Sequence, residues 1–177
     1  MKKSYRVAMG GMVSALAVIS MFLTGFIPIG TYALPAFAGA LLLVIALEFD
    51  VRWAYLVYIA VSILCLLVTP DREAAVLFVT FFGHYPTTKL LIERIHSRII
   101  QWLVKFGLFN GTMILSFWAM MHLLGMAEIA DEFGEFGRWG AWIFLLLGNI
   151  VFVLLDIALT GMKRFYLLRV QKKLMRK

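Results

Sequence analysis

One carboxylate, Asp156, lies well inside the last long apolar run of the chain. Ionisable residues inside a membrane span are costly, and they usually serve transport, an ion pair or a partner. Counting from Trp139 at about 1.5 Å per residue places Asp156 about 26 Å along a helix, in the last third of a bilayer core about 30 Å thick. At that depth its carboxylate can reach Arg6, Lys89 or Lys105. A structural ion pair and a part in transport or partner coupling therefore both stay open.

Other polar residues also interrupt apolar runs. Asn149 lies near the middle of the same apolar run as Asp156, and Asn110 lies early in the preceding run. Such side-chain amides either bond a neighbouring helix or line a cavity. His122 is placed equally well for an interfacial position or a ligand contact. The segment 83–86, Gly-His-Tyr-Pro, breaks a further run. It is compatible with a discontinuous transporter helix or with a plain proline kink.

Motifs of enzymes are absent from the sequence. It contains no Walker A loop, HExxH, CxxC or paired aspartates. Glu93 and His96 form one ExxH, but a di-metal site needs two such motifs and further carboxylates, so we interpret the pair as part of a polar helix face. The single Cys65 excludes a disulfide framework. The sequence therefore predicts no enzyme activity, no metal and no cofactor.

The composition is that of a membrane protein. Of the 177 residues 63% are hydrophobic and 15% charged, with a mean hydropathy of +0.91, which is outside the range of soluble domains. The charges fall in the gaps between apolar runs. Residues 89–105 hold four basic side chains against one glutamate, whereas residues 128–138 hold four acidic side chains against one arginine.

This alternation of sign predicts the topology. The positive-inside rule places the 89–105 segment and both basic termini in the cytoplasm and the acidic loop outside. The positive block at the C-terminus directly follows an apolar run, so we expect it to meet anionic lipid headgroups and not nucleic acid. We expect a multi-pass protein of the plasma membrane, the inner membrane of a bacterium.

Six apolar runs are long enough to be spans, because about 20 residues of helix cross the hydrocarbon core. They cover residues 7–27, 34–48, 53–69, 74–92, 106–125 and 139–161. The second and third are close enough to form a tight antiparallel hairpin. The fourth has only 12 residues before Pro86, so it must continue through this proline, with a kink, to cross. The predicted fold is all-α, a single transmembrane domain over residues 1–177.

A polar residue recurs every four positions between the fourth and fifth spans, at Lys89, Glu93, Ser97, Gln101 and Lys105. Apolar residues occupy the other side of the same helical pattern. This periodicity predicts an amphipathic helix that lies in the cytoplasmic interface of the membrane with its apolar side down.

Small residues form a stripe on the first span, at Ala8, Gly11 and Ala15, with Gly10 and Ser14 beside them. A helix face with little side chain lets another backbone come close, and in lipid such packing replaces the hydrophobic drive between helices. The stripe is either an internal packing face or a docking face for another membrane protein.

Together these features resemble the substrate-binding S components of energy-coupling-factor (ECF) transporters. The shared features are a basic N-terminus, the small-residue stripe, a proline-containing segment 26–35, and six spans without an ATPase motif. The resemblance implies a subunit that captures a small micronutrient-like molecule from outside and works with a transmembrane T component and ATPase subunits. The family's docking motif is Ala-x-x-x-Ala; here the matching register reads Ala8-x-x-x-Met12, and Gly11-x-x-x-Ala15 is the nearest substitute.

By position, the resemblance implies a substrate pocket at the outer ends of the helices, lined by Tyr32, His122, Trp142 and Asn149. The alternative is a non-catalytic scaffold of the bacterial envelope that recruits partners and binds no small molecule.

Overall fold

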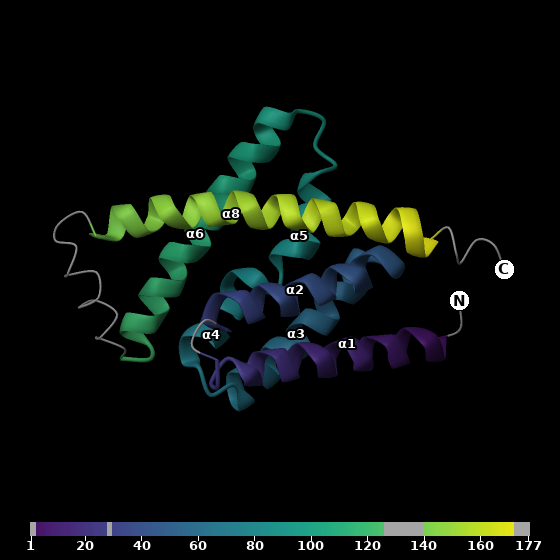
Figure 1. Cartoon of the computed structure of the whole chain (residues 1–177), viewed down its shortest axis with the longest axis horizontal. Coiled ribbons are helices and arrows are strands. Elements are labelled where there is room, and N and C mark those ends of the chain that lie inside the picture. Colours follow the sequence, from purple (N-terminus) through teal and green to yellow (C-terminus); the bar gives the residue numbers. More distant parts are fainter. Residues whose placement is uncertain (1–2, 28–29, 126–139, 172–177) are drawn as a thin grey trace.

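The computed structural model describes residues 3–27, 30–125 and 140–171. Its regular elements are helices (Figure 1), and six of them are long and apolar enough to cross a membrane. They are α1 (Lys3–Leu23), α2 (Gly30–Glu48), α3 (Val51–Val68), the composite fourth span (Arg72–Ile92), α6 (Arg98–His122) and α8 (Gly140–Phe165), which continues as the π-helical turn η3 (Tyr166–Gln171). The predicted all-α fold with six spans is confirmed.

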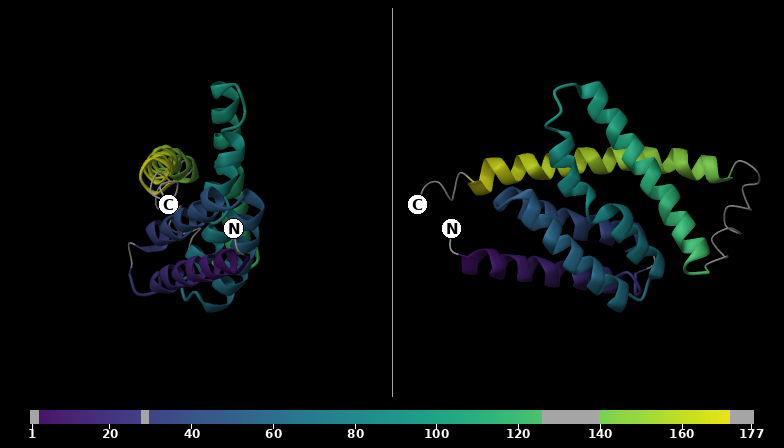
Figure 2. Two further views of the ribbon diagram at one scale, coloured as in Figure 1. Left: turned by 90° about the vertical axis from the view of Figure 1, so that its right-hand side faces the viewer. Right: turned by 180° about the vertical axis from the view of Figure 1, so that it is seen from behind.

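The start of α1 and the end of α8 lie at the same end of the bundle (Figures 1 and 2). Two long-range contacts hold this end together. The Arg6 guanidinium lies 2.6 Å from the Asp50 carboxylate, and the Tyr166 hydroxyl donates to Glu48. We call it the basic end.

Helix α2 lies at the centre and packs against α1, α3, the fourth span and α8. It forms one apolar cluster with α1, α3 and the start of the fourth span, through buried residues such as Ala17, Leu42 and Val61. A second cluster joins α2 to the fourth span, α6 and α8 through Leu43, Phe81 and Phe152. Thus α2 links the N-terminal helices to the C-terminal pair.

A tight hairpin connects α2 and α3, as predicted. Asp50 is the N-cap of α3, and its carboxylate accepts a 2.7 Å hydrogen bond from the backbone N–H of Trp53. This bond satisfies one of the N–H groups that a helix start leaves without a partner. The same bond, together with Arg6, lowers the pKa of Asp50. Asp50 therefore stays charged and both begins α3 and holds α1.

The fourth span crosses in three pieces: α4 (Arg72–Leu77), the π-helical turn η1 (Phe78–Phe82) and α5 (Tyr85–Ile92). Pro86 lies in the first turn of α5, where its missing N–H costs little. The break at residues 83–84 and the continuation past Pro86 agree with the predicted kink. The Tyr58 hydroxyl donates to the Val79 carbonyl at 2.5 Å, so a side chain from α3 satisfies part of the irregular turn.

Gly39 marks the closest approach of α2 to the fourth span. A Cβ atom at this position would lie 2.0 Å from the Phe82 carbonyl oxygen and 3.4 Å from the Pro86 ring. The neighbour is backbone and has no rotamer by which to move away. Only glycine therefore allows α2 to lie this close to η1.

The interfacial helix predicted between the fourth and fifth spans is not a separate element. Lys89 belongs to α5, a non-helical connection follows Glu93, and residues from Arg98 onward form one continuous helix to His122. The period of four polar residues is real, but this side faces the protein: Lys89 is 0% exposed and Lys105 is 4% exposed. The prediction placed the polar side in water, because the sequence of this segment alone does not show that Asp156 of α8 pairs with both lysines.

Candidate functional site

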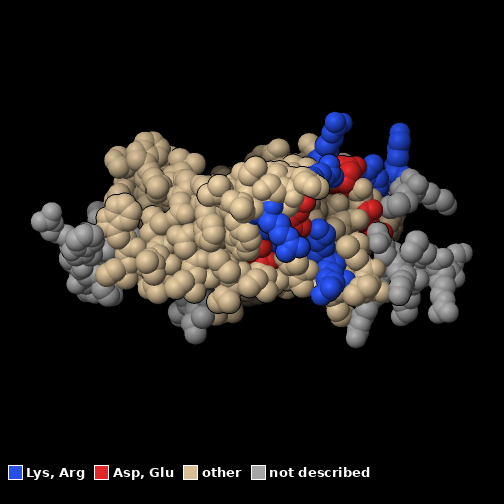
Figure 3. Space-filling view, turned by 90° about the horizontal axis from the view of Figure 1, so that it is seen from above, with Lys and Arg blue, Asp and Glu red and all other residues tan. Residues whose placement is uncertain are grey.

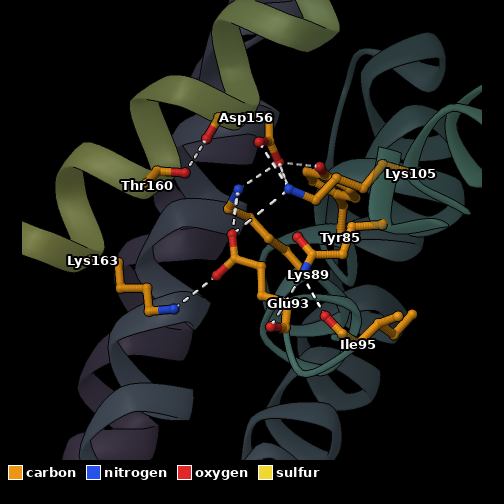
Figure 4. A network of polar contacts seen from close by, with 9 residues as sticks. Tyr85, Lys89, Glu93, Ile95, Lys105, Asp156, Thr160 and Lys163 are labelled. Carbon is orange, nitrogen blue, oxygen red and sulfur yellow. Dashed lines mark hydrogen bonds and ion pairs between the residues drawn. The ribbon is translucent and has the colours of Figure 1, made fainter. Parts of the chain in front are cut away.

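Asp156 is the centre of a buried network of charges between α5, α6 and α8 (Figure 4). One carboxylate oxygen lies 2.5 Å from the Lys89 ammonium, and the other accepts from Lys105 at 2.9 Å. The Tyr85 hydroxyl also donates to Asp156, at 2.5 Å. Asp156 is only 4% exposed. A buried charge needs such complete pairing, because its loss of hydration is otherwise not offset.

Glu93 extends this network toward the basic end. Its carboxylate accepts from Lys89 at 2.9 Å and from Lys163 at 2.7 Å, and so joins the end of α5 to α8. Gln101 donates to the Ile95 carbonyl at 2.6 Å and thereby fixes the connection between α5 and α6. Of the polar residues spaced by four, Lys89 and Lys105 are thus buried, while Glu93 and Gln101 are half-buried and bonded beside them.

We call the five charged residues, Lys89, Glu93, Lys105, Asp156 and Lys163, the charge network. Three lysines against two carboxylates leave a formal charge of +1. Aromatic rings cover its inner side: Tyr85 stacks on Phe81 with ring centroids 4.8 Å apart and meets Phe152 at 5.2 Å. These rings separate the ions from the central part of the bundle. The network acts as an ionic joint for three helices.

Part of this joint agrees with the partners predicted for Asp156 from the sequence. Lys89 and Lys105 were two of the three proposed partners of Asp156, and both contact it. The third, Arg6, does not, since it pairs with Asp50. Tyr85 and Glu93 were missed as members. The signal for them was available in the sequence, because Tyr85, Lys89 and Glu93 lie four residues apart and therefore on one helix face.

Asn149, a predicted substrate contact, pairs with Asn110. The two side-chain amides exchange hydrogen bonds of 3.0 and 3.1 Å, and each also donates to a carbonyl of its own helix. Of the two interpretations left open for these residues, helix-to-helix bonding is the one observed. The pair joins the middle of α6 to the middle of α8.

The other three predicted substrate contacts lie on different helices. The Tyr32 hydroxyl on α2 donates to Glu73 at 2.7 Å, while His122 on α6 stacks on Trp118 with centroids 5.3 Å apart. Trp142 on α8 is 69% exposed. Their helix ends lie away from the basic end (Figure 1). Trp139 and the acidic loop fall outside the described residues.

The small-residue stripe on α1 divides into two faces. Gly10 is buried, and a Cβ there would lie 3.5 Å from the Trp53 indole of α3. In contrast Ala8, Gly11 and Ala15 are exposed, and a Cβ on Gly11 would meet nothing within 4 Å. Internal packing therefore uses the Gly10 face and leaves the Gly11 face of α1 without a covering helix in the described structure.

The charge network predicts a dependence of stability on pH. Burial acts to raise the pKa of Glu93, but the hydrogen bonds from Lys163 and Lys89 outweigh it and lower that pKa. A carboxylate with a lowered pKa stabilises the fold above its unfolded pKa, and this contribution is lost as pH falls through the folded pKa. We expect the thermal midpoint of the protein in lipid nanodiscs, followed by circular dichroism, to fall on acidification below about pH 4.3, the ordinary range of glutamate.

The Glu93→Gln variant provides the control. It should be less stable than the wild type at pH 7 and lose less stability on acidification, since it has no carboxylate at this position to protonate. Parallel pH profiles for both proteins would contradict the assignment of this dependence to Glu93.

Comparisons of the chain with protein families, with curated proteins and with solved structures find no match.

Proposed function

We propose that this protein is the membrane-embedded substrate-binding subunit of an ECF-type importer. It captures a small micronutrient-like molecule from outside and passes it inward together with a transmembrane T component and ATPase subunits. Support comes from the layout of six spans and from the absence of an ATPase motif in the sequence. The observation that carries the proposal is the exposed small-residue face of α1.

Ala8, Gly11 and Ala15 form that face, which we call the α1 face. Helix association in lipid depends on close packing, and small residues allow backbones to approach. Here the neighbouring face of the same helix already packs on α3, through Gly10 and Trp53. The α1 face is therefore free for a helix of another protein, and the T component is the proposed partner.

The proposed orientation places the basic end in the cytoplasm. Lys163, Arg164 and the residues that follow α8 in sequence are rich in positive charge, as are the residues before α1. By the positive-inside rule both termini then lie inside. Tyr32, His122 and Trp142 lie on helix ends directed outward, and we retain these three as the proposed ligand-binding residues.

One observation favours a second candidate, a scaffold that recruits partners without binding a small molecule. Asn149 could either bond a neighbouring helix or line a ligand cavity, and its side chain is bonded to Asn110 and to a carbonyl of α8. A scaffold would use the α1 face in the same manner and need no ligand pocket. Native mass spectrometry separates the two, because only the importer subunit should carry a reproducible small molecule.

Substitutions on the α1 face test the proposal directly. We expect the Gly11→Leu and Ala15→Leu double variant to fold with the thermal stability of the wild type but to lose co-purification of the T component and the ATPases. The reason is that both positions are exposed and a Cβ at Gly11 meets open space, whereas a leucine side chain blocks close approach of a partner helix. Affinity purification from the native membrane, with the partners quantified by mass spectrometry, measures the loss.

Gly111→Leu is the matched control. Gly111 is likewise an exposed helical glycine with open space at its Cβ, but it lies on α6. This variant should keep the complex. If both variants retain it, the α1 face is not the docking surface. If the wild type co-purifies neither a T component nor ATPases, the importer proposal is wrong.

A further inference from the structure

Helices α6 and α8 cross and then diverge toward the basic end (Figures 1 and 2). They are in contact where the Phe109 and Phe152 rings stack with centroids 4.7 Å apart, and the Lys105–Asp156 pair joins them one turn further on. Beyond this pair an open groove of about 740 Å³ lies along α8, with Trp102 of α6 on its opposite wall. We call it the α6–α8 groove.

The walls of the α6–α8 groove are apolar and belong to membrane spans. Trp102, Ile157 and Leu167 line it, and all three are exposed, Ile157 to 60%. Gly161 lies between them, and a Cβ at this position would meet nothing within 4 Å. Within a span, exposed apolar side chains face hydrocarbon, so the groove is open to lipid chains from the side.

Positive side chains also line the groove, between Gly161 and Leu167 along α8 and the turn that follows it. Arg164 is exposed and makes no hydrogen bond or ion pair with the described part of the chain. Lys163 also lines the groove. Its ammonium has three N–H donors, and its contact with Glu93 leaves others for a ligand. Figure 3 shows the charged side chains, acidic as well as basic, in the middle and right-hand part of the described surface, whereas the described left-hand part is uncharged.

The carboxylate of Asp156 also lines the groove but does not oppose an anion there. Its oxygens are already bonded to Lys89, Lys105 and Tyr85. The charge network has a formal charge of +1, and Arg164 raises the local sum to +2. An uncompensated positive charge beside a hydrocarbon-facing groove matches one anionic group attached to apolar chains.

We propose that the α6–α8 groove is a binding site for one anionic phospholipid. The lipid phosphate lies against Arg164 and Lys163, since a guanidinium binds phosphate oxygens through two parallel N–H bonds. The acyl chains lie along Trp102 and Ile157, with one chain over Gly161, and Leu167 borders the groove on the headgroup side. The charges and the apolar walls together favour an anionic lipid over a free anion, which would leave the walls uncovered, and over phosphatidylcholine, whose quaternary ammonium cancels the charge of its phosphate.

Native mass spectrometry of the purified protein tests this site. The probes are dioleoyl phosphatidylglycerol and dioleoyl phosphatidylcholine, added separately to the micelles in equal amounts. We expect the wild type to retain one phosphatidylglycerol at least tenfold more strongly than phosphatidylcholine. The Gly161→Leu and Arg164→Gln double variant, which fills the groove and removes its free charge, should lose this preference.

The matched control combines Gly111→Leu with Arg94→Gln. It makes the same two chemical changes at an exposed helical glycine and an exposed arginine outside the α6–α8 groove. It should retain phosphatidylglycerol as the wild type does. Arg164→Gln alone changes only an exposed side chain and reports on the headgroup contact if the double variant does not fold.

Three results would overturn the proposal. Equal retention of the two lipids would show that charge does not select the occupant. Equal loss in the groove variant and the control variant would show general electrostatic attraction without a site. Displacement of the lipid by inorganic phosphate at millimolar concentration would identify a site for a soluble anion in place of a lipid.

Discussion

The Asp156→Ala variant is expected to lose about 3 to 5 kcal/mol of its stability, the range for breaking a buried ion pair by removal of one partner. Lys89 and Lys105, which are 0% and 4% exposed, would then face each other with Glu93 as their one remaining carboxylate partner in the charge network, 2.9 Å from Lys89 and 3.7 Å from Lys105. Neither side chain reaches water in the folded state, so the helices must separate to hydrate them. We expect α8 to come away from α5 and α6 first.

The single cysteine of the chain supplies the measurement. Cys65 is 0% exposed, on α3, within the apolar cluster of α1 and α2. Its labelling by a thiol-reactive dye therefore reports global unfolding, while circular dichroism in mixed micelles with rising dodecyl sulfate reports loss of helix. The Asp156→Ala variant should unfold at a clearly lower dodecyl sulfate fraction by both measures.

A second substitution provides the control for this result. Removing both members of a buried pair costs far less than removing one, because no unpaired charge is left. Adding Lys105→Met to Asp156→Ala should therefore recover part of the stability, with Lys89 still paired to Glu93. If Asp156→Ala alone unfolds like the wild type, or if Lys105→Met makes it less stable still, the charge network does not hold these helices.

The Gly39→Ala variant should be destabilised by about 3 kcal/mol, the upper part of the usual range for overpacking a core. The new methyl group would lie 2.0 Å from the Phe82 carbonyl oxygen, so α2 and η1 must move apart. This movement would also loosen Leu43 and Phe81, which pack in the same region. The same dodecyl sulfate titration measures the loss.

Gly111→Ala is the matched substitution for this prediction. Gly111 lies in α6 with nothing within 4 Å of a Cβ, and alanine is the better helix former. It should leave stability unchanged or raise it slightly. Equal effects of the two alanines would show that helix propensity, and not the contact between α2 and η1, governs Gly39.

Much of the fold could be predicted from local sequence. Six spans, the tight α2–α3 hairpin and the crossing of the fourth span past Pro86 all follow from apolar run lengths and from the special geometry of proline. These are properties of short segments in lipid, where each backbone must form its own hydrogen bonds. The position of Asp156, in the last third of its span, was also predictable, because it follows from counting residues at the fixed rise of a helix.

Which face of a helix is buried could not be predicted from local sequence, because it depends on residues far away in the chain. The polar residues from Lys89 to Lys105 have the pattern of a helix on the membrane surface, and no feature of that segment alone indicates burial. Lys89 lies 67 residues from Asp156 and Lys105 lies 51 residues from it. Only when α8 brings its carboxylate to this place does burial of both lysines become favourable.

The same distinction applies to the polar and small residues. Apolar run lengths alone place Asn110 and Asn149 within spans, and residue spacing alone gives α1 two small-residue faces. The folded bundle is needed to see that the two amides bond each other and that α3 covers the Gly10 face while the Gly11 face stays exposed. Hydropathy is a sum over neighbours along the chain, whereas ion pairs and close packing need atoms within a few ångströms of each other, and only folding brings residues from distant helices that close.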